Sequence, residues 1–584
     1  MRSAMNAVSG ERPKILTAAL KRTGLFSTLV YLAAIYYTST IIGFNGPFAE
    51  HTRISEHALM PGLVTERFNK EGLLSEYLKS FPPNSDRQKL ICEQLHSVGI
   101  PCHEQNWSLQ TGLKNQSGQN VYGVVRARRA TGVEAMLLAV EIEHKEAVAL
   151  MMSYATFAKE QVYWARDLFF VFVEGGPIGM DAFLSQYQLA SQTTIQAEPL
   201  KETGGSLIGG IVIKSQRQNT KRKTIHVQLN QLNGQLPNLD LFNSIVRIAG
   251  MGKFGLETVI YNVWDANRGG LDWPLLVPLR AIYTQAFVAA EGTHSVFGKY
   301  GVQGLTVAVP LASNYPLAQS TRLVEAVARA LNNVLERFHQ SYFMYVLTSE
   351  DNFLSIAYYM PCMAVVAPLL LFAYREWVHL VVFSIPVNWL LLHVFGGFVW
   401  LLSSHLFTTL IPADPKWTIL TALLFSPLGL LLPMDKSQLP ALRLVTYLEF
   451  ALAAMALSLT NFGLAFICSA VTVPFFLRLS LPTYETYRTL IRTAASFFLH
   501  PLSVYLLFLV YAEPYLEYKA RRIDYSLDGV LLLVKDSLAR LLQEQLIYGS
   551  HVFTLMCLIA LPLWNSLIAI VSCKTEQLPH EKND

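Results

Sequence analysis

Residues 24–44 read GLFSTLVYLAAIYYTSTIIGF, an apolar stretch without a single charged residue. About 20 such residues, wound as a helix, cross the hydrocarbon core of a bilayer. A cleaved signal peptide would have a shorter core followed by a small-residue cleavage site, so an uncleaved signal-anchor is favoured. Lys14, Lys21 and Arg22 precede the stretch and, by the positive-inside rule, place residues 1–23 in the cytosol. The chain after this span is therefore expected outside the cytosol.

A second apolar block begins after Asn352. Its candidate spans are 353–373, 377–403, 417–434, 441–460, 462–480, 494–512 and 549–572. Charged residues between these spans alternate toward the cytosolic side, which predicts about eight spans in total and a cytosolic tail at 573–584. Only 15% of the whole chain is charged, against about 25% in soluble globular proteins. The region 353–572 is therefore predicted to be a polytopic α-helical membrane domain.

Residues 526–547, between the last two spans, read SLDGVLLLVKDSLARLLQEQLI. Leucine and valine recur on one face at helical spacing, and the charged side chains lie opposite them. Four charged residues well inside the segment, Lys535, Asp536, Arg540 and Glu544, argue against a ninth span. We expect an amphipathic helix on the membrane surface or against a partner.

Residues 47–350 read as one α/β domain with segments of helical periodicity near 64–80, 87–98, 146–160 and 180–190. Apolar runs of strand length alternate with these segments at 121–125, 135–140, 168–173, 207–213, 225–229 and 305–309. The run LFFVFV at 168–173 shows no polar alternation, as expected of a central parallel strand buried on both faces. The alternation predicts a three-layer fold around a mostly parallel sheet.

Two features of this domain, a cysteine pair and two sequons, depend on whether it lies outside the cytosol. Cys92 and Cys102 flank Gly99 and form a disulfide if the domain is outside the cytosol, although two buried free thiols are an equal alternative. The sequons at Asn106 and Asn115 precede the first apolar strand and are candidate N-glycosylation sites. The net charge of +4 is spread over 584 residues, so no nucleic-acid partner is expected.

The usual motifs of catalysis are missing: we find no GxSxG elbow, P-loop, HExxH or dinucleotide-binding glycine pattern. Glu174 directly follows the buried strand LFFVFV, at the edge where α/β domains place ligands. It is either a site residue or a solvated glutamate that begins a turn. His294, in the segment GTHSVF, is either a ligand or base, or a turn histidine bonded to the backbone.

A strand that ends in an acid and glycines, followed later by H-x-x-F-x-x-x-G-V, resembles the zinc-dependent aminopeptidase-like fold. That resemblance implies a His and an Asp after an early strand, a Glu-Glu pair, a later Asp and a final His. Here the early strand runs into Glu141-Ile142-Glu143-His144, and Gly175 follows Glu174 where the metal-bridging acid would stand. We therefore expect an aminopeptidase-like scaffold with no metal and no cofactor, in which Glu174 and His294 are vestigial active-site positions.

A wider resemblance covers nearly the whole chain. Its segments are FAEHTRISEHALMPG (48–62), NVYGVVR (120–126), QVYWARD (161–167), LNGQLPNLDLFN (232–243) and GLDWP (270–274). In order and spacing they are similar to the GPI-anchor attachment (Gaa-type) family, the large polytopic subunit of GPI transamidase. The resemblance implies residence in the endoplasmic reticulum membrane with the large domain luminal. It also implies a caspase-like catalytic subunit and further transamidase subunits as partners, with GPI lipid and a proprotein peptide as substrates.

By the same resemblance, the protein is a non-catalytic subunit that presents GPI lipid. A proline in the last span of related subunits is thought to serve GPI recognition, and Pro562 matches it by position. Pro562 frees the carbonyl of Leu558 and kinks the helix, so Pro562, Trp564 and Asn565 are the candidate lipid-binding residues. The alternative for them is ordinary packing against another helix.

Two other functions are kept as alternatives. A membrane-tethered zinc aminopeptidase would need a rearranged site made of Glu141, Glu143, His144, Glu174 and Asp240. A transporter would need ionisable groups inside the spans, where Glu449 is one of the few.

Overall fold

The computed structural model describes residues 22–43, 50–51, 65–80, 86–111, 115–128, 131–190, 192, 194–216, 223–261, 273–287, 292–311, 317–334, 344–380, 385–406, 425, 427–428, 436–479, 494, 498–506 and 527–572. Its contacts divide the chain into two compact units. The helical unit contains Met1–Ile41, Tyr358–Ala539 and His551–Asp584. The α/β unit contains Ile42–Ala357 and, from the far end of the chain, Arg540–Ser550.

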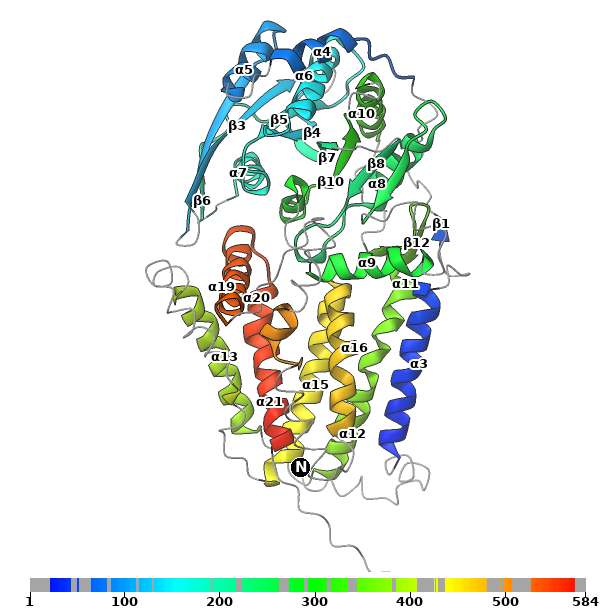
Figure 1. The fold of residues 1–584 in the computed structure, drawn as a ribbon, viewed down its shortest axis with the longest axis vertical. Coiled ribbons are helices and arrows are strands. Elements are labelled where there is room, and N and C mark those ends of the chain that lie inside the picture. Colours follow the sequence, from blue (N-terminus) through cyan, green and yellow to red (C-terminus); the bar gives the residue numbers. More distant parts are fainter. Residues whose placement is uncertain are drawn as a thin grey trace, which may run out of the picture. The chain divides into compact units, whose positions relative to one another are not determined.

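Nine strands of the described residues form one sheet in the order β6-β2-β3-β5-β4-β7-β10-β8-β9 (Figure 1). Their bounds are β2 Cys102–Gln110, β3 Asn115–Val125, β4 Glu134–Glu141, β5 Asp167–Val173, β6 Ile195–Ala197, β7 Ser206–Gln216, β8 Thr224–Gln228, β9 Glu257–Ile260 and β10 Gly304–Pro310. The four central strands β5, β4, β7 and β10 are parallel, as predicted. The sheet as a whole is mixed, because β6, β2 and β3 form an antiparallel flank and β8 joins β10 antiparallel.

Helices cover both faces of this sheet (Figure 1). One face packs against α4 (Glu71–Ser80), α5 (Arg87–Ser97), α6 (Lys145–Glu160), α8 (Leu239–Gly250) and α10 (Leu317–Asn332). The other packs against α7 (Pro177–Tyr187) and the 3-10 helix η5 (Thr293–Tyr300).

Strand β5 shows why the sequence requires two helical layers. Phe170 and Phe172 lie in the core on the α6 side, whereas Phe169 and Val171 lie in the core on the α7 side. Successive side chains of a strand point to opposite faces, so a strand of seven buried residues needs cover on both. The predicted three-layer α/β fold is confirmed.

The α/β unit also holds a small sheet, a further helix and, as Arg540–Ser550, the end of the predicted amphipathic segment. A small sheet joins β1 (Glu50–His51), β12 (Asn352–Ser355) and β11 (Tyr345–Leu347), and α9 spans Trp273–Phe287. The predicted amphipathic segment forms α19 (Leu527–Gln543) and continues as the π-helical turn η10 (Glu544–Tyr548). Ile547 of η10 packs with Trp107, Ile178 and Ala182, so the end of this segment is bound by the α/β unit of its own chain.

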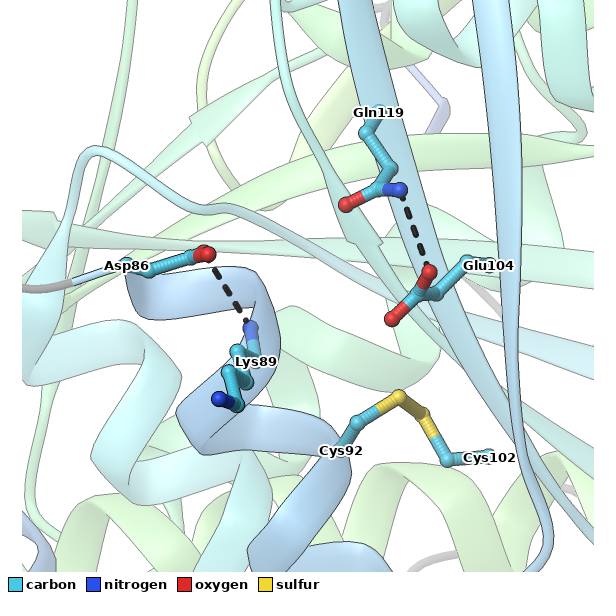
Figure 2. Close-up of a disulfide and its surroundings, with 6 residues drawn as sticks. All are labelled: Asp86, Lys89, Cys92, Cys102, Glu104 and Gln119. Carbon is cyan, nitrogen blue, oxygen red and sulfur yellow. Dashed lines mark hydrogen bonds between the residues drawn. A yellow bond between two sulfur atoms is a disulfide. The ribbon is translucent and has the colours of Figure 1, made fainter.

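Cys92 and Cys102 form a disulfide that links α5 to the start of β2, with their Cα atoms 5.3 Å apart (Figure 2). Asp86 caps α5 by accepting a hydrogen bond from the backbone N–H of Lys89 at 3.3 Å. Helix α5 ends in front of Gly99, whose φ of +73° suits glycine and lets the chain reverse into β2. The disulfide therefore closes a short helix–turn–strand element.

Five helices of the described residues are long and apolar enough to cross a membrane: Thr23–Gly43, Ile356–Val378, Val387–His405, Leu439–Ser458 and Val552–Ser572. Their segments are α3 (Thr23–Gly43), α11 (Ile356–Tyr359), η6 (Met360–Val366), α12 (Ala367–His379), α13 (Val387–His405), α15 (Leu439–Ser458), α20 (Val552–Leu555), η11 (Met556–Ala560) and α21 (Leu561–Ser572). The shorter apolar helix α16 covers Phe462–Leu479. The polytopic helical architecture is confirmed. Most of the predicted span 417–434 and about half of 494–512 lie outside the described residues, as do nearly all of 1–23 and all of 573–584. The total of eight spans therefore stays a prediction.

Candidate functional site

The C-terminal ends of the central strands carry a compact polar cluster. Glu141, the last residue of β4, has its carboxylate 3.7 Å from Nζ of Lys214 on β7 and 3.2 Å from Nε2 of His144. The hydroxyl of Thr293 donates to the same side chain at 2.7 Å. Burial alone would raise the pKa of Glu141, but these three neighbours lower it to about 2. Glu141 is therefore an ionised carboxylate that contacts Thr293 and His144, with the ammonium group of Lys214 nearby.

His294, one of the two predicted vestigial positions, lies inside this edge of the sheet and is 1% exposed. Its Nδ1 is 2.8 Å from the hydroxyl of Thr306 on β10. Burial lowers the pKa of His294 to about 3, and the charge of Lys214 acts in the same direction. The backbone of Asn230 and the carboxylate of Glu141 favour the protonated ring but do not offset burial. His294 is thus a neutral, interior imidazole at physiological pH.

Glu174, the other predicted position, follows β5 but bonds toward β3 and α5. Its carboxylate accepts the backbone N–H of Gln119 at 2.6 Å and the side-chain amide of Gln88 at 3.1 Å. Gly175, at φ +79°, turns its N–H toward the carboxylate of Glu143 at 3.4 Å. Glu174 and His294 therefore have separate sets of partners, and Glu174 anchors the strand beside it.

The alternative function, a zinc aminopeptidase, needs five side chains to meet at one site, and the structure brings only some of them together. Glu141 and His144 are in contact, whereas Glu143 faces Gly175 and Asp240 lies in the first turn of α8. Within the part of the chain that the structure describes, no three or more His, Cys, Asp or Glu side chains are grouped so as to hold a metal ion. The residues present do not fit a zinc centre, and Lys214 supplies the positive charge beside Glu141 instead.

The buried imidazole makes a testable prediction about pH. In the unfolded chain histidine takes up a proton near pH 6.5, whereas folded His294 does so only near pH 3. Below pH 6.5 the unfolded state thus binds more protons, so the free energy of unfolding falls with falling pH, by up to about 1.4 kcal/mol per pH unit. His294→Gln should flatten the loss of thermal stability between pH 6.5 and 5. His96→Gln, at an exposed histidine of α5, should leave that slope unchanged; equal slopes in all three proteins would contradict the assignment.

The helical unit contains a second polar cluster that the sequence reading touched only through Glu449. One carboxylate oxygen of Glu449 on α15 accepts the indole N–H of Trp389 on α13 at 2.7 Å, and the other lies 2.7 Å from Nε2 of His393. The second ring nitrogen of His393 lies 2.9 Å from the carbonyl oxygen of Trp389. Both ring nitrogens thus face acceptors, and the carboxylate of Glu449 has a partner at each of its oxygens. This pairing reduces the cost of placing the two groups inside a span.

The three candidate lipid-binding residues are buried in α21. The side-chain amide of Asn565 donates to the carbonyl of Leu561 at 3.1 Å, one turn earlier in the same helix. The ring of Trp564 packs against that of His500 with centroids 4.6 Å apart. Pro562 follows a π-helical stretch, η11, and is covered by α13. Asn565 is thus satisfied within its own helix, and Pro562 and Trp564 contact protein.

Helix α13 approaches Pro562 at a glycine, Gly396. A Cβ atom added to Gly396 would lie 2.5 Å from the carbonyl oxygen of Cys557 and 2.9 Å from Cγ of Pro562. Small residues let membrane helices approach this closely. Pro562 and Gly396 therefore lie on the two sides of one helix–helix contact.

The sequon asparagines both lie on the antiparallel flank of the sheet. Asn106 is in β2, and its side-chain amide donates to Glu198 at 3.2 Å. Asn115 is the exposed first residue of β3. Sequence reasoning missed the surroundings of Asn106, because the polar segment 102–110 carries no apolar strand signal.

Comparison with known proteins covers both units. Residues 117–568 match the family described as Gaa1-like, GPI transamidase component. The GPI transamidase component gaa1 of Schizosaccharomyces pombe is 28% identical over an alignment of 378 residues. The match covers 60% of this chain and 65% of that protein, slightly less than two thirds of its length. The GPI transamidase component GAA1 of Saccharomyces cerevisiae is 26% identical over 477 residues, 75% of this chain and 73% of that protein.

Solved structures resemble part of the chain. A glutaminyl cyclase of Fimbriiglobus ruber is 12% identical, with 47% of this chain and 97% of that chain covered and a TM-score of 0.31. A zinc aminopeptidase of Bacillus subtilis is 9% identical, with 45% and 95% covered and a TM-score of 0.29.

Proposed function

This chain belongs to the Gaa1-like family of GPI transamidase components, and we propose that it is a non-catalytic subunit of that complex. In this role it presents GPI lipid and helps to attach it to the C-terminus of proprotein substrates in the endoplasmic reticulum. The observation that carries the proposal is the family match over 117–568, which includes residues of both units. The nucleophile is supplied by a separate, caspase-like subunit.

The chemistry of the α/β unit supports a non-catalytic role. Its two described cysteines, Cys92 and Cys102, are joined in the disulfide, and the free cysteines of the described residues lie in the helical unit. His294 is buried and neutral, and Glu141 is held by Lys214. The hydroxyl of Thr306 and the ring of His294 lie 2.8 Å apart, but both residues are 1% exposed. This hydroxyl–imidazole pair is therefore buried and is not presented to a substrate, as acyl transfer by this chain would require.

A pull-down in mild detergent tests the proposal. The tagged chain, isolated from cells and analysed by mass spectrometry, should recover a caspase-like protease and further transamidase subunits in near-equal amounts. Recovery of the chain without any protease of that kind would contradict the assignment.

The orientation of the α/β unit is part of this proposal and makes a second prediction. If residues 47–350 are luminal, Asn115 should carry an N-linked glycan, because it is exposed at a strand end. Asn106 should be used less, since it lies in the middle of β2 and its amide donates to Glu198. Endoglycosidase should raise gel mobility, and Asn115→Gln should remove most of that shift while Asn106→Gln removes little. A chain without glycan whose α/β unit is accessible to cytosolic protease would reverse the orientation.

The third prediction concerns GPI lipid. We propose that the kink at Pro562 shapes the path by which GPI reaches the complex, with Trp564 and Asn565 beside it. Pro562→Leu restores a backbone N–H to the helix and straightens it, so GPI recovered per mole of purified complex should fall severalfold while the subunits still co-purify. Pro474→Leu, at another proline inside a helix of the same unit, is the matched control and should keep normal recovery. Unchanged GPI recovery in an assembled Pro562→Leu complex would place the lipid path elsewhere.

A further inference from the structure

The antiparallel flank of the sheet presents a polar face that the proposed function does not use. The strand register aligns residues of β3, β2 and the end of β6 in two rows that cross the strands. Asn106 is the β2 residue of one row, and Ser108 is the β2 residue of the other. Side chains two residues apart in a strand share a face. Six polar side chains therefore stand together on one surface: Gln119 and Ser117, Asn106 and Ser108, and Glu198 and Gln196.

Helix cover ends before this surface begins. On the same face of β3, Val121 and Val125 are buried in a core that includes Ile91 and Leu95 of α5. Nearer the start of β3, the side chains on this face are no longer buried, and Ser117 is exposed. The uncovered part of the sheet is hollowed into an open groove of about 850 Å³, lined by the six polar side chains, with Glu174 at its margin.

Hydrogen bonds hold the lining side chains in place. Glu198 accepts both the backbone N–H of Asn106, at 3.1 Å, and its side-chain amide, at 3.2 Å. The amide of Gln119 donates to Asn106 at 3.1 Å and across the hairpin to Glu104 at 3.2 Å (Figure 2). Each amide and carboxylate keeps further donor or acceptor capacity. The groove thus offers donors and acceptors side by side in a preformed array.

Charge and polarity restrict the occupant. Among the described residues that line the groove there is no lysine, arginine or histidine, while Glu174 and Glu198 are present. A phosphate or other anion would find no cation here. The ring of Trp107 is buried in the core with Ile178, and the other apolar side chains of the lining are small, so a lipid tail would gain little burial. A neutral ligand rich in hydroxyl groups, each able to donate and accept, fits this lining.

The sequons point to the same chemistry. Asn106 and Ser108 of one sequon lie on this face, as do Asn115 and Ser117 of the other, because the first and third residues of each share a face. A glycan on Asn115 would begin next to Ser117, at the end of the groove. When Asn115 is glycosylated, its carbohydrate therefore lies beside the side chains of the groove.

We propose that this groove binds a short neutral oligosaccharide. Two sources have this chemistry: the chain's own N-linked glycan on Asn115, or the glycan of an incoming GPI substrate, the second of which rests on the proposed function. Glu198 and Gln196 bind its hydroxyl groups from one side, and Gln119 from the other.

Binding of α-linked mannobiose to the purified full-length chain in detergent tests the proposal, measured by saturation-transfer NMR and titration. The chain with Asn115→Gln, and without other glycans, should bind the sugar. The added pair Gln196→Ala and Glu198→Ala should weaken binding about tenfold or more, because several hydrogen bonds are lost. Glu93→Ala, which removes an exposed carboxylate of α5 outside the groove, should leave affinity unchanged.

Binding to the glycosylated chain distinguishes the two sources of the oligosaccharide. If its own glycan fills the groove, mannobiose should bind only after endoglycosidase treatment or in Asn115→Gln; if the groove is free for substrate, both forms should bind equally. Equal binding by the groove variant and its parent, or no binding by either form, would overturn the proposal. The pull-down that tests for the caspase-like subunit is run on the same proteins. If the complex assembles but the groove does not bind sugar, this inference is wrong and the proposed function is unaffected.

Discussion

Gly396→Leu is expected to break the contact between α13 and the last helix. A leucine Cβ would stand 2.5 Å from the carbonyl oxygen of Cys557, a distance at which the helices must separate. Overpacking of this kind costs about 1–3 kcal/mol and sometimes more. We therefore expect a clear fall in the unfolding temperature of the detergent-purified chain, with loss of GPI recovery if the kink at Pro562 serves lipid.

Gly397→Leu is the matched control. A Cβ at Gly397 meets no atom within 4 Å, so a leucine there has open space. Both substitutions raise helix propensity by a similar amount, roughly 0.8 kcal/mol, so the difference between the two proteins isolates the packing at Gly396. Equal unfolding temperatures would show that α13 does not approach the last helix as described.

Arg166→Ala should destabilise the α/β unit strongly. Arg166 is 7% exposed, bonds Glu134 at 2.8 Å and donates to the carbonyls of Leu331, Asn332 and Val334 at the end of α10. Alanine would leave several buried acceptors and one carboxylate without this partner. Such a loss costs about 3–5 kcal/mol, and at about 2–4 °C per kcal/mol in a unit of this size the unfolding temperature should drop by roughly 10 °C.

Arg128→Ala serves as the control for Arg166→Ala, since Arg128 is exposed. Its removal should change the free energy of unfolding by no more than about 0.5 kcal/mol. The comparison is read by differential scanning fluorimetry of the detergent-purified proteins. A drop of less than about 2 °C for Arg166→Ala would mean that the end of α10 does not depend on the guanidinium.

Local composition explains which elements were predictable. The six apolar runs became β3, β4, β5, β7, β8 and β10, because strands buried on both faces must be apolar throughout. Strands β2 and β6 escaped prediction, since a flank with one uncovered face alternates polar and apolar residues over short lengths. The family resemblance is confirmed by the match over 117–568.

The candidate sites were less predictable. Glu174 and His294 stay predictions as vestigial active-site positions, and the structure shows only that Glu174 bonds Gln119 and His294 bonds Thr306. The central pair at this edge is instead Glu141 with Lys214. Nothing in the sequence near Lys214 marks it, because its role depends on the register between β4 and β7.

The sequence by itself determined the membrane-spanning helices, the α/β class of the large unit and the family. These follow from apolar length, periodicity and ordered motifs, which are properties of contiguous residues. Only the tertiary structure decided which distant residues meet: Glu449 with His393 inside the helical unit, Ile547 with Trp107 in the α/β unit, and the polar rows of β3, β2 and β6. The reason is that such contacts are set by how helices pack and strands align, and a shift of one residue in register would turn every side chain of a strand to the other face.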